Sequence, residues 1–143
     1  MASIIETFAY ARAGLIGNPS DGYYGKTISI SVRNFRARVL CYPAANLEIR
    51  GSSIDQPVWR SIDELREGVK KYGYYGGLRL IRAIIKRFAD HCDEKGVRLP
   101  KRNCAIEYES DIPGRVGLAG SSAIITATLR ALMQFYEVEI PKE

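Results

Sequence analysis

The most constraining feature of the chain is a run of small residues placed directly before a long apolar helical pattern. Residues 113–137 read PGRVGLAGSSAIITATLRALMQFYE. Glycine has no side-chain bulk and allows a positive φ, so Gly117 and Gly120 predict a turn that a ligand can approach closely. The apolar spacing that follows predicts a helix from residue 121 to about residue 137.

Two serines stand where this helix would begin. The first amide groups of a helix have no intrahelical partner, and the helix dipole is positive at that end. Ser121 and Ser122 therefore predict a site for an anion such as a phosphate, and a serine N-cap after a glycine turn is the alternative. The common phosphate loops fit poorly, because no lysine follows as in a Walker loop and the GxGxxG spacing is missing.

Hydrophobic patterns divide the rest of the chain into strands and helices. Thr27, Ser29 and Ser31 alternate with apolar residues as in a strand, and Asn34 predicts a tight connection to the next strand. Ser61 followed by Glu64 is a capping box, which predicts a helix start. The order of elements predicts an α+β domain with a mostly antiparallel sheet backed by helices. The predicted strands cover residues 5–16, 26–33, 35–42, 47–50 and 103–110, and the predicted helices cover residues 61–73, 78–96 and 121–137.

Composition restricts the partners and the compartment. The 143 residues fit one domain, and a net charge of +5 mildly favours an anionic partner such as a nucleotide, a sugar acid or nucleic acid. Cys41, Cys92 and Cys104 are odd in number and far apart, so we expect free thiols rather than disulfides or a zinc site. Since the sequence shows neither a membrane-spanning run nor a secretory signal, we expect a cytoplasmic protein without a membrane partner.

The segment PGRVGLAGSSAI resembles the second motif of the GHMP kinases, small-metabolite kinases that include galactokinase, homoserine kinase and mevalonate kinase. That motif runs P-x-x-x-G-L-x-S-S-A. The stretch GLAGSSA has one residue more than the corresponding part of this motif. With this extra residue it resembles the plant-type glucuronokinase branch of the family. The matching residues are Pro113, Gly117, Leu118, Ser121, Ser122 and Ala123.

An earlier segment resembles the first GHMP motif, a strand and loop that hold the sugar in galactokinase-like members. It reads ARAGLIGNPSDGYYGKTIS, residues 11–29. Asn18 and Pro19 replace the Glu-His pair of galactokinases, so galactose itself is not the expected substrate. The segment YGYYGGLRLIRAIIKRF, residues 72–88, is a third and weaker similarity to the glucuronokinase branch. The residues that match the first motif are Arg12, Leu15, Ile16, Gly17, Ser20 and Asp21.

The resemblance implies phosphoryl transfer from ATP, with Mg²⁺, to a sugar or sugar acid. For the glucuronokinase branch this is D-glucuronate at its anomeric hydroxyl, and Lys26 or Arg33 could meet the uronate carboxylate. The implied metal ligand is Ser122, and the implied catalytic group is Arg12. The implied substrate-binding residues are Arg12, Asn18, Ser20, Asp21 and Lys26. The implied ATP-binding residues are Pro113, Gly114, Gly117, Leu118, Ala119, Gly120, Ser121, Ser122 and Ala123.

The resemblance also implies an incomplete enzyme. In the family the chain continues past this helix with further strands, a catalytic Asp, a second metal-binding carboxylate and a third glycine-rich motif. We therefore expect residues 1–143 to be a C-terminally truncated GHMP kinase N-terminal domain that lacks the catalytic base and is inactive alone. An unpaired sheet edge predicts either a dimer or association with the missing half.

A non-catalytic module that binds nucleic acid or another partner is the alternative function, because ribosomal proteins use the same βα scaffold. A basic face at helical spacing fits this alternative, although a solvated helix surface explains the same residues. Nucleic acid is thus the less expected partner, after a nucleotide and a sugar acid. The residues of this face are Arg79, Arg82, Lys86 and Arg87.

Overall fold

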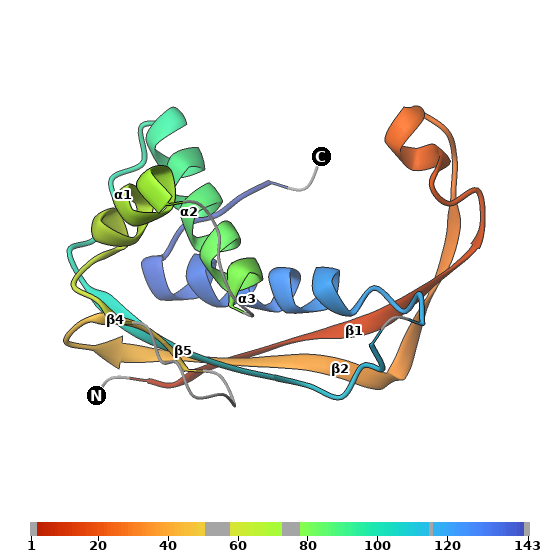
Figure 1. The fold of residues 1–143 in the computed structure, drawn as a ribbon, viewed down its shortest axis with the longest axis horizontal. Coiled ribbons are helices and arrows are strands. Elements are labelled where there is room, and N and C mark those ends of the chain that lie inside the picture. The colour runs from red at the N-terminus through yellow and green to blue at the C-terminus, as the bar shows by residue number, and fades with distance from the viewer. Residues whose placement is uncertain (1–2, 51–57, 73–77, 115, 142–143) are drawn as a thin grey trace.

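The computed structural model describes residues 3–50, 58–72, 78–114 and 116–141. The chain forms two layers, a five-stranded sheet and three helices that cover one of its faces (Figure 1). The elements in chain order are β1 (Ile5–Ile16), the 3-10 helix η1 (Ser20–Tyr23), β2 (Ile28–Ala44), β3 (Leu47–Arg50), β4 (Val58–Trp59), α1 (Ile62–Tyr72), α2 (Arg79–Glu94), β5 (Asn103–Ser110) and α3 (Gly120–Tyr136).

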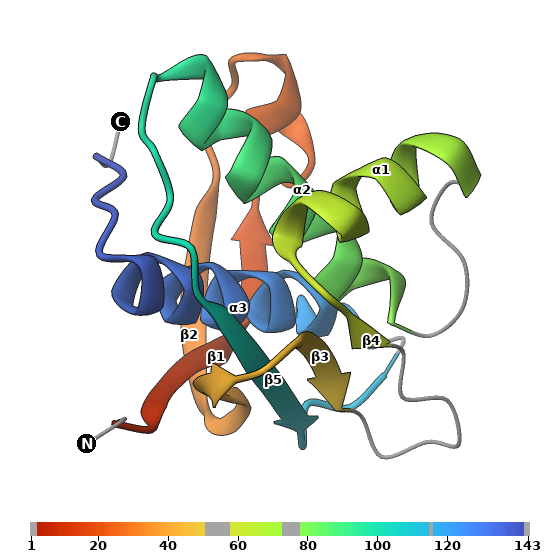
Figure 2. The ribbon, with the colours of Figure 1, turned by 90° about the vertical axis from the view of Figure 1, so that its left-hand side faces the viewer.

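The sheet has the strand order β1-β2-β5-β3-β4. Neighbouring strands pair antiparallel, except that β3 and β5 run parallel to each other (Figure 2). A mostly antiparallel sheet with helices on one face confirms the predicted α+β class. The two-residue strand β4 was not predicted, since two residues are too short for an alternating pattern.

Strands β1 and β2 continue beyond the other strands as a two-stranded arm that carries η1 at its tip (Figure 1). The predicted connection at Asn34 is wrong, because β2 is one strand that runs through this residue. Tyr10 pairs with Arg36, yet the next residue of β1, Ala11, pairs with Val32, so residues 33–35 bulge out of the ladder. A bulge bends a strand and increases its twist. The arm accordingly curves towards the helix layer.

The helices begin and end where local chemistry predicts. Ser61 Oγ accepts the backbone N–H of Glu64 at 3.1 Å, as expected of a capping box. Gly96, with a φ of 69°, follows α2 and ends it. Residues 73–77, which include most of the YGYYGG segment, lie outside the described residues. All five predicted core residues of the second helical pattern are buried: Leu78, Ile81, Ile85, Phe88 and Cys92.

Helix α3 lies between the sheet and α2 and fixes the far end of the chain against its beginning (Figure 2). Ala127 and Ala131 are fully buried, and such small side chains let the helix approach the strands closely. Thr7 Oγ1 on β1 donates to the Ala127 carbonyl at 2.7 Å inside this interface. The start of α3 therefore stands beside the arm. In the described part of the chain, no helix combines the length and hydropathy needed to cross a bilayer.

Candidate active site

The loop between β5 and α3 presents bare backbone at the start of a helix. Ala119 is the N-cap residue and adopts a left-handed conformation, with φ 55° and ψ 39°. No side chain of the described residues caps the helix, and the first helical bond runs from the Ala123 N–H to the Ala119 carbonyl at 3.0 Å. The amides of residues 120–122 therefore precede the hydrogen-bond ladder of α3, as an anion site requires.

This geometry corrects two details of the sequence reading. The alternative of a serine N-cap is wrong, because Ser121 and Ser122 lie one and two residues inside the helix and both are exposed. Gly117 has the expected positive φ of 76°, but Ala119 rather than Gly120 makes the second left-handed turn. Gly120 has no positive φ, and a Cβ there would make an ordinary contact with Ile112 Cγ2 at 3.4 Å.

The first predicted motif folds beside this loop and is joined to it by a backbone bond. The Arg12 N–H donates to the Leu118 carbonyl at 3.1 Å. Asp111 fixes the beginning of the loop, because its Oδ1 accepts the Arg36 N–H of β2 at 2.6 Å. Two segments about a hundred residues apart in the chain are thus brought together as one site.

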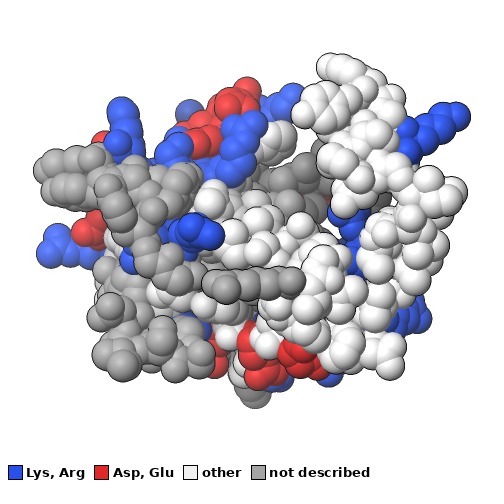
Figure 3. Space-filling model, turned by 45° about the vertical axis from the view of Figure 1, so that its right-hand side comes forward, with Lys and Arg blue, Asp and Glu red and all other residues white. Residues whose placement is uncertain are grey.

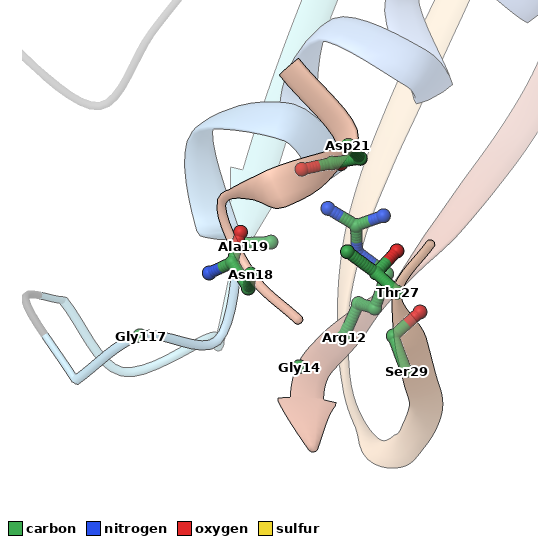
Figure 4. A pocket seen from close by; sticks show the side chains of 8 residues that line it. All are labelled: Arg12, Gly14, Asn18, Asp21, Thr27, Ser29, Gly117 and Ala119. Atoms are coloured by element: carbon green, nitrogen blue, oxygen red, sulfur yellow. The ribbon is translucent and has the colours of Figure 1, made fainter. Parts of the chain in front are cut away.

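Three pockets surround the loop and meet at Ala119. The arm pocket, about 240 Å³, lies between the arm and the loop (Figure 4). The loop pocket, about 300 Å³, lies on the side of Pro113, Gly114 and Ser121. The edge pocket, about 370 Å³, lies along α3 and the free edge of β1. Arg12 lines both the arm pocket and the edge pocket, so it stands at their junction.

The arm pocket gathers three of the predicted substrate-binding residues. Arg12, Asn18 and Asp21 all line it, and Figure 4 shows the Arg12 guanidinium pointing towards Asp21. Ser20 and Lys26 are not among its described lining residues. The Ser20 hydroxyl is hydrogen-bonded to the Gly17 and Lys26 carbonyls, the latter at 3.1 Å, so Ser20 closes the loop that presents its neighbours.

The predicted ATP-binding residues divide between the pockets. Ser122 and Ala123 line the edge pocket together with Arg12, whereas Ser121 lines the loop pocket. The two serines consequently face different sides of the helix start. The remaining predicted residues lie along the loop pocket, and two of them also line the arm pocket: Pro113, Gly114, Gly117, Leu118, Ala119 and Gly120.

Several lining residues were not predicted as site residues. Thr27, Ser29 and Gly14 complete the arm pocket, and Thr126 and Arg130 line the edge pocket. Arg130 also donates from Nη1 to the Phe8 carbonyl at 2.7 Å. Two patterns could have revealed them. Thr27 and Ser29 alternate along a strand, and Thr126 and Arg130 follow Ser122 at intervals of four on one helix face.

Charge is sparse around the three pockets. Asp21 and Arg12 are the charged residues among the described lining of the arm pocket, and Arg12 and Arg130 are those of the edge pocket. Figure 3 shows a largely uncharged face over the arm, with Lys and Arg atoms in the hollow beside it. The described residues contain no group of three or more His, Cys, Asp or Glu side chains able to hold a metal.

The comparisons with known proteins agree with this architecture. Residues 79–143 match the family described as GHMP kinases N terminal domain. The chain is 42% identical over 135 residues to Glucuronokinase 1 of Arabidopsis thaliana. This alignment spans 94% of this chain and 37% of that protein. The chain thus corresponds to little more than a third of the length of this relative.

Solved structures share the fold at low sequence identity. The galactokinase of Lactococcus lactis, in a complex with galactose, superimposes with a TM-score of 0.76 at 17% identity, over 97% of this chain and 34% of that one. The mevalonate kinase of Methanococcus jannaschii gives 0.72 at 20% identity, over 99% of this chain and 42% of that one. Sequence and fold together confirm the resemblance seen in the two motifs: the chain is related to the glucuronokinases and carries the GHMP kinase N-terminal domain.

Proposed function

We propose that the chain supplies the phosphate loop and part of the sugar site of a kinase that phosphorylates a sugar or sugar acid with ATP. The substrate proposed is D-glucuronate, phosphorylated at its anomeric hydroxyl. The observation that carries this proposal is the bond between Arg12 N–H and the Leu118 carbonyl, with the arm pocket beside it. A polar pocket for an acceptor therefore adjoins the uncapped start of a helix, which suits an anion.

Each part of the site suits one demand of phosphoryl transfer, which depends mainly on positioning and charge neutralisation. The loop amides and the positive end of α3 suit the nucleotide phosphates. Arg12 can neutralise charge on the transferring group because it lies between the arm pocket and the edge pocket. Asp21 can accept hydrogen bonds from sugar hydroxyls.

The residues present fit a magnesium–nucleotide complex rather than a preformed metal cage. Mg²⁺ keeps several waters and binds through one or two protein oxygens together with substrate phosphates. Ser122 is exposed on the edge pocket and would supply a hydroxyl oxygen, while its partner Ser121 faces the loop pocket. Bound Mg²⁺ would neutralise phosphate charge. We propose no catalytic base within this chain.

Nucleotide binding to the purified chain tests the phosphate loop. Titration calorimetry with ADP should show binding in the presence of Mg²⁺, and Ser122→Ala should weaken it by about 10-fold. In EDTA the difference between the two proteins should shrink, because the proposed role of Ser122 is towards the metal. Ser121→Ala is the matched comparison, and its effect should not depend on Mg²⁺. Equal nucleotide affinity for wild type and Ser122→Ala in Mg²⁺ would contradict the assignment.

The charge distribution disfavours the nucleic-acid alternative. On the helix-free face of the sheet, Arg38 pairs with Glu6 and with Glu109 at 3.0 Å, and Arg50 pairs with Glu48 at 2.6 Å. The hydrogen bond to Glu6 raises the pKa of Arg38. Cations that are already matched by carboxylates form no continuous basic stripe.

On the predicted basic face of α2, Lys86 and Arg87 are matched by carboxylates in the same way. Lys86 contacts Asp90, Arg87 contacts Glu94 at 3.0 Å, and Arg82 lies over the Trp59 ring at 5.2 Å. We therefore expect no retardation of single-stranded or double-stranded RNA by the chain at 150 mM salt, which is about a physiological ionic strength. Salt-sensitive RNA binding without nucleotide binding would favour the alternative function.

A further inference from the structure

A row of hydroxyl side chains follows the beginning of β2. Thr27 lies directly before β2, and Ser29 and Ser31 alternate with Ile28 and Ile30, so the two serine hydroxyls share one side of the strand. Thr27 and Ser29 line the arm pocket, whereas Ser31 lines the edge pocket. Serine is a weaker strand former than the β-branched and aromatic residues, so local strand stability does not account for two serines here.

A glycine stands opposite Ser29, where the loop lies close to the strands. Gly14 of β1 pairs with Ser29 across the arm and also lines the pocket. A Cβ at Gly14 would lie 3.2 Å from the Asn18 Cβ, a contact tight enough to displace Asn18. The missing side chain therefore lets Asn18 lie close to β1, beside the pair of Gly14 and Ser29.

The two walls of the arm pocket are complementary in their hydrogen-bonding groups. Figure 4 shows Asn18 and Asp21 on one side, with Thr27 and Ser29 across the pocket from them. The first wall offers an amide and an acid, and the second wall offers two hydroxyls, each of which can both donate and accept. Within the described residues, neither the Thr27 nor the Ser29 hydroxyl makes a hydrogen bond.

We propose that Thr27 and Ser29 form the second wall of the sugar site and help determine its specificity for a polyhydroxylated ring. This inference rests on the proposed function, whose predicted substrate-binding residues include Asn18 and Asp21 of the first wall but neither Thr27 nor Ser29. A sugar hydroxyl is itself a donor and an acceptor, so a facing hydroxyl matches it in either orientation. Two such groups, separated by one strand residue, can contact two hydroxyls of one ring.

Titration of the 143-residue chain with D-glucuronate, followed by NMR, tests the second wall. Thr27→Val keeps the shape of the side chain and removes the hydroxyl, and Ser29→Ala removes the other hydroxyl. Each should weaken glucuronate binding by about 5- to 10-fold, the loss expected for one hydrogen bond. Thr27→Ser retains a hydroxyl and should stay within about 2-fold of wild type. Asn34→Ala, an exposed change in the bulge of the same strand, is the control outside the pocket.

The affinity for Mg-ADP separates this inference from the proposed function. We expect Thr27→Val and Ser29→Ala to bind Mg-ADP like the wild type, which also shows that both variants are folded. The inference is overturned if both variants bind glucuronate as tightly as wild type, or if the wild-type chain binds Mg-ADP and no glucuronate. In the second case the phosphate site still stands. Hydroxyl-dependent glucuronate binding without Mg-ADP binding would support the second wall and contradict the phosphate loop.

Discussion

Gly17 holds a position in the arm that no residue with a side chain can fill without moving the backbone. Its φ is 85°, and a Cβ there would lie 2.2 Å from the Lys26 carbonyl oxygen. The same carbonyl is hydrogen-bonded to Ser20, whose carbonyl in turn accepts the Gly25 N–H at 2.7 Å. These contacts shape the loop that presents Asn18 and Asp21 to the arm pocket.

Gly17→Ala should therefore distort this loop. We expect a loss of about 1 to 3 kcal/mol in the free energy of unfolding, because both a clash and a left-handed backbone are imposed on alanine. Gly22→Ala in the same loop is the matched control, since nothing lies within 4 Å of a Cβ there. Thermal melts measure both changes. A Gly17→Ala melting temperature no lower than that of Gly22→Ala would contradict the described loop geometry.

The three thiols should be inert in the folded chain. Cys41, Cys92 and Cys104 are fully buried, and a hydrogen bond to Cys104 together with burial raises the pKa of the Cys41 thiol. Burial also raises the pKa of Cys92. Because the thiolate is the reactive form, an aromatic disulfide reagent should label no thiol rapidly at pH 8 and three after unfolding. Fast labelling of one native thiol would contradict this packing.

Single residues show where sequence reasoning reaches the site and where it does not. Arg12, Asn18 and Asp21 could be predicted because a motif fixes their spacing, and they do line one pocket. Ser20 belongs to the same motif but closes the loop, because its hydroxyl lies against two carbonyls that only the folded backbone brings together. Arg130 was missed, since its place in the edge pocket depends on the packing of α3 against β1.

At the scale of elements, a cluster of charges joins α1 to α2. Arg66 of α1 contacts Asp90 at 2.9 Å and Asp93 at 2.6 Å, both on α2, and Lys86 also contacts Asp90. Burial disfavours the ionised carboxylate of Asp90, but the hydrogen bonds from Lys86 and Arg66 outweigh it and hold the pKa of Asp90 below its ordinary value. The two helices are thus held together partly by charge.

This lowered pKa gives the helix pair a defined dependence on pH. A carboxyl whose pKa is lower in the folded state stabilises the fold above its ordinary pKa, near 4, and loses that contribution as the pH falls through the lowered value. Asp90→Asn should destabilise the chain by about 1 kcal/mol at pH 7, and this difference should shrink as the pH falls below about 4 and through the lowered pKa of Asp90. Denaturant melts across this range measure it. A difference that stays constant down to acid pH would contradict the proposed ion pairs.

The elements themselves were largely predictable because their hydrophobic periods are regular. The core positions of α2 follow from the apolar spacing, and the start of α1 follows from Ser61 and Glu64. The bulge at residues 33–35 could not be distinguished from a turn, since both interrupt alternation at a polar residue such as Asn34. Only the continuous partner strand β1 decides that β2 passes through without reversing.

At the scale of the whole molecule, the arm exposes apolar side chains to solvent. Among the described strands, β1 also forms an edge of the sheet. Such surfaces favour association. We expect sedimentation velocity to show concentration-dependent self-association, which Ile16→Lys should weaken by placing a charge on the arm. Val97→Lys, an exposed apolar site outside the arm, is the control. A single monomeric species at every concentration would contradict this prediction. The exposed apolar residues of the arm are Leu15, Ile16, Tyr23, Tyr24, Ile28 and Ile30.

The packing of α3 against β1 also sets an order of events during synthesis. Thr7 bonds to Ala127 across 120 positions of the chain, and Arg12 reaches the Leu118 carbonyl in the same region. A ribosome that has released the first strand must still translate the residues up to α3 before either contact can form. The strand therefore remains without its α3 contacts until that helix has emerged. Any ligand pocket between them is a late product of translation, however early its first residues were made.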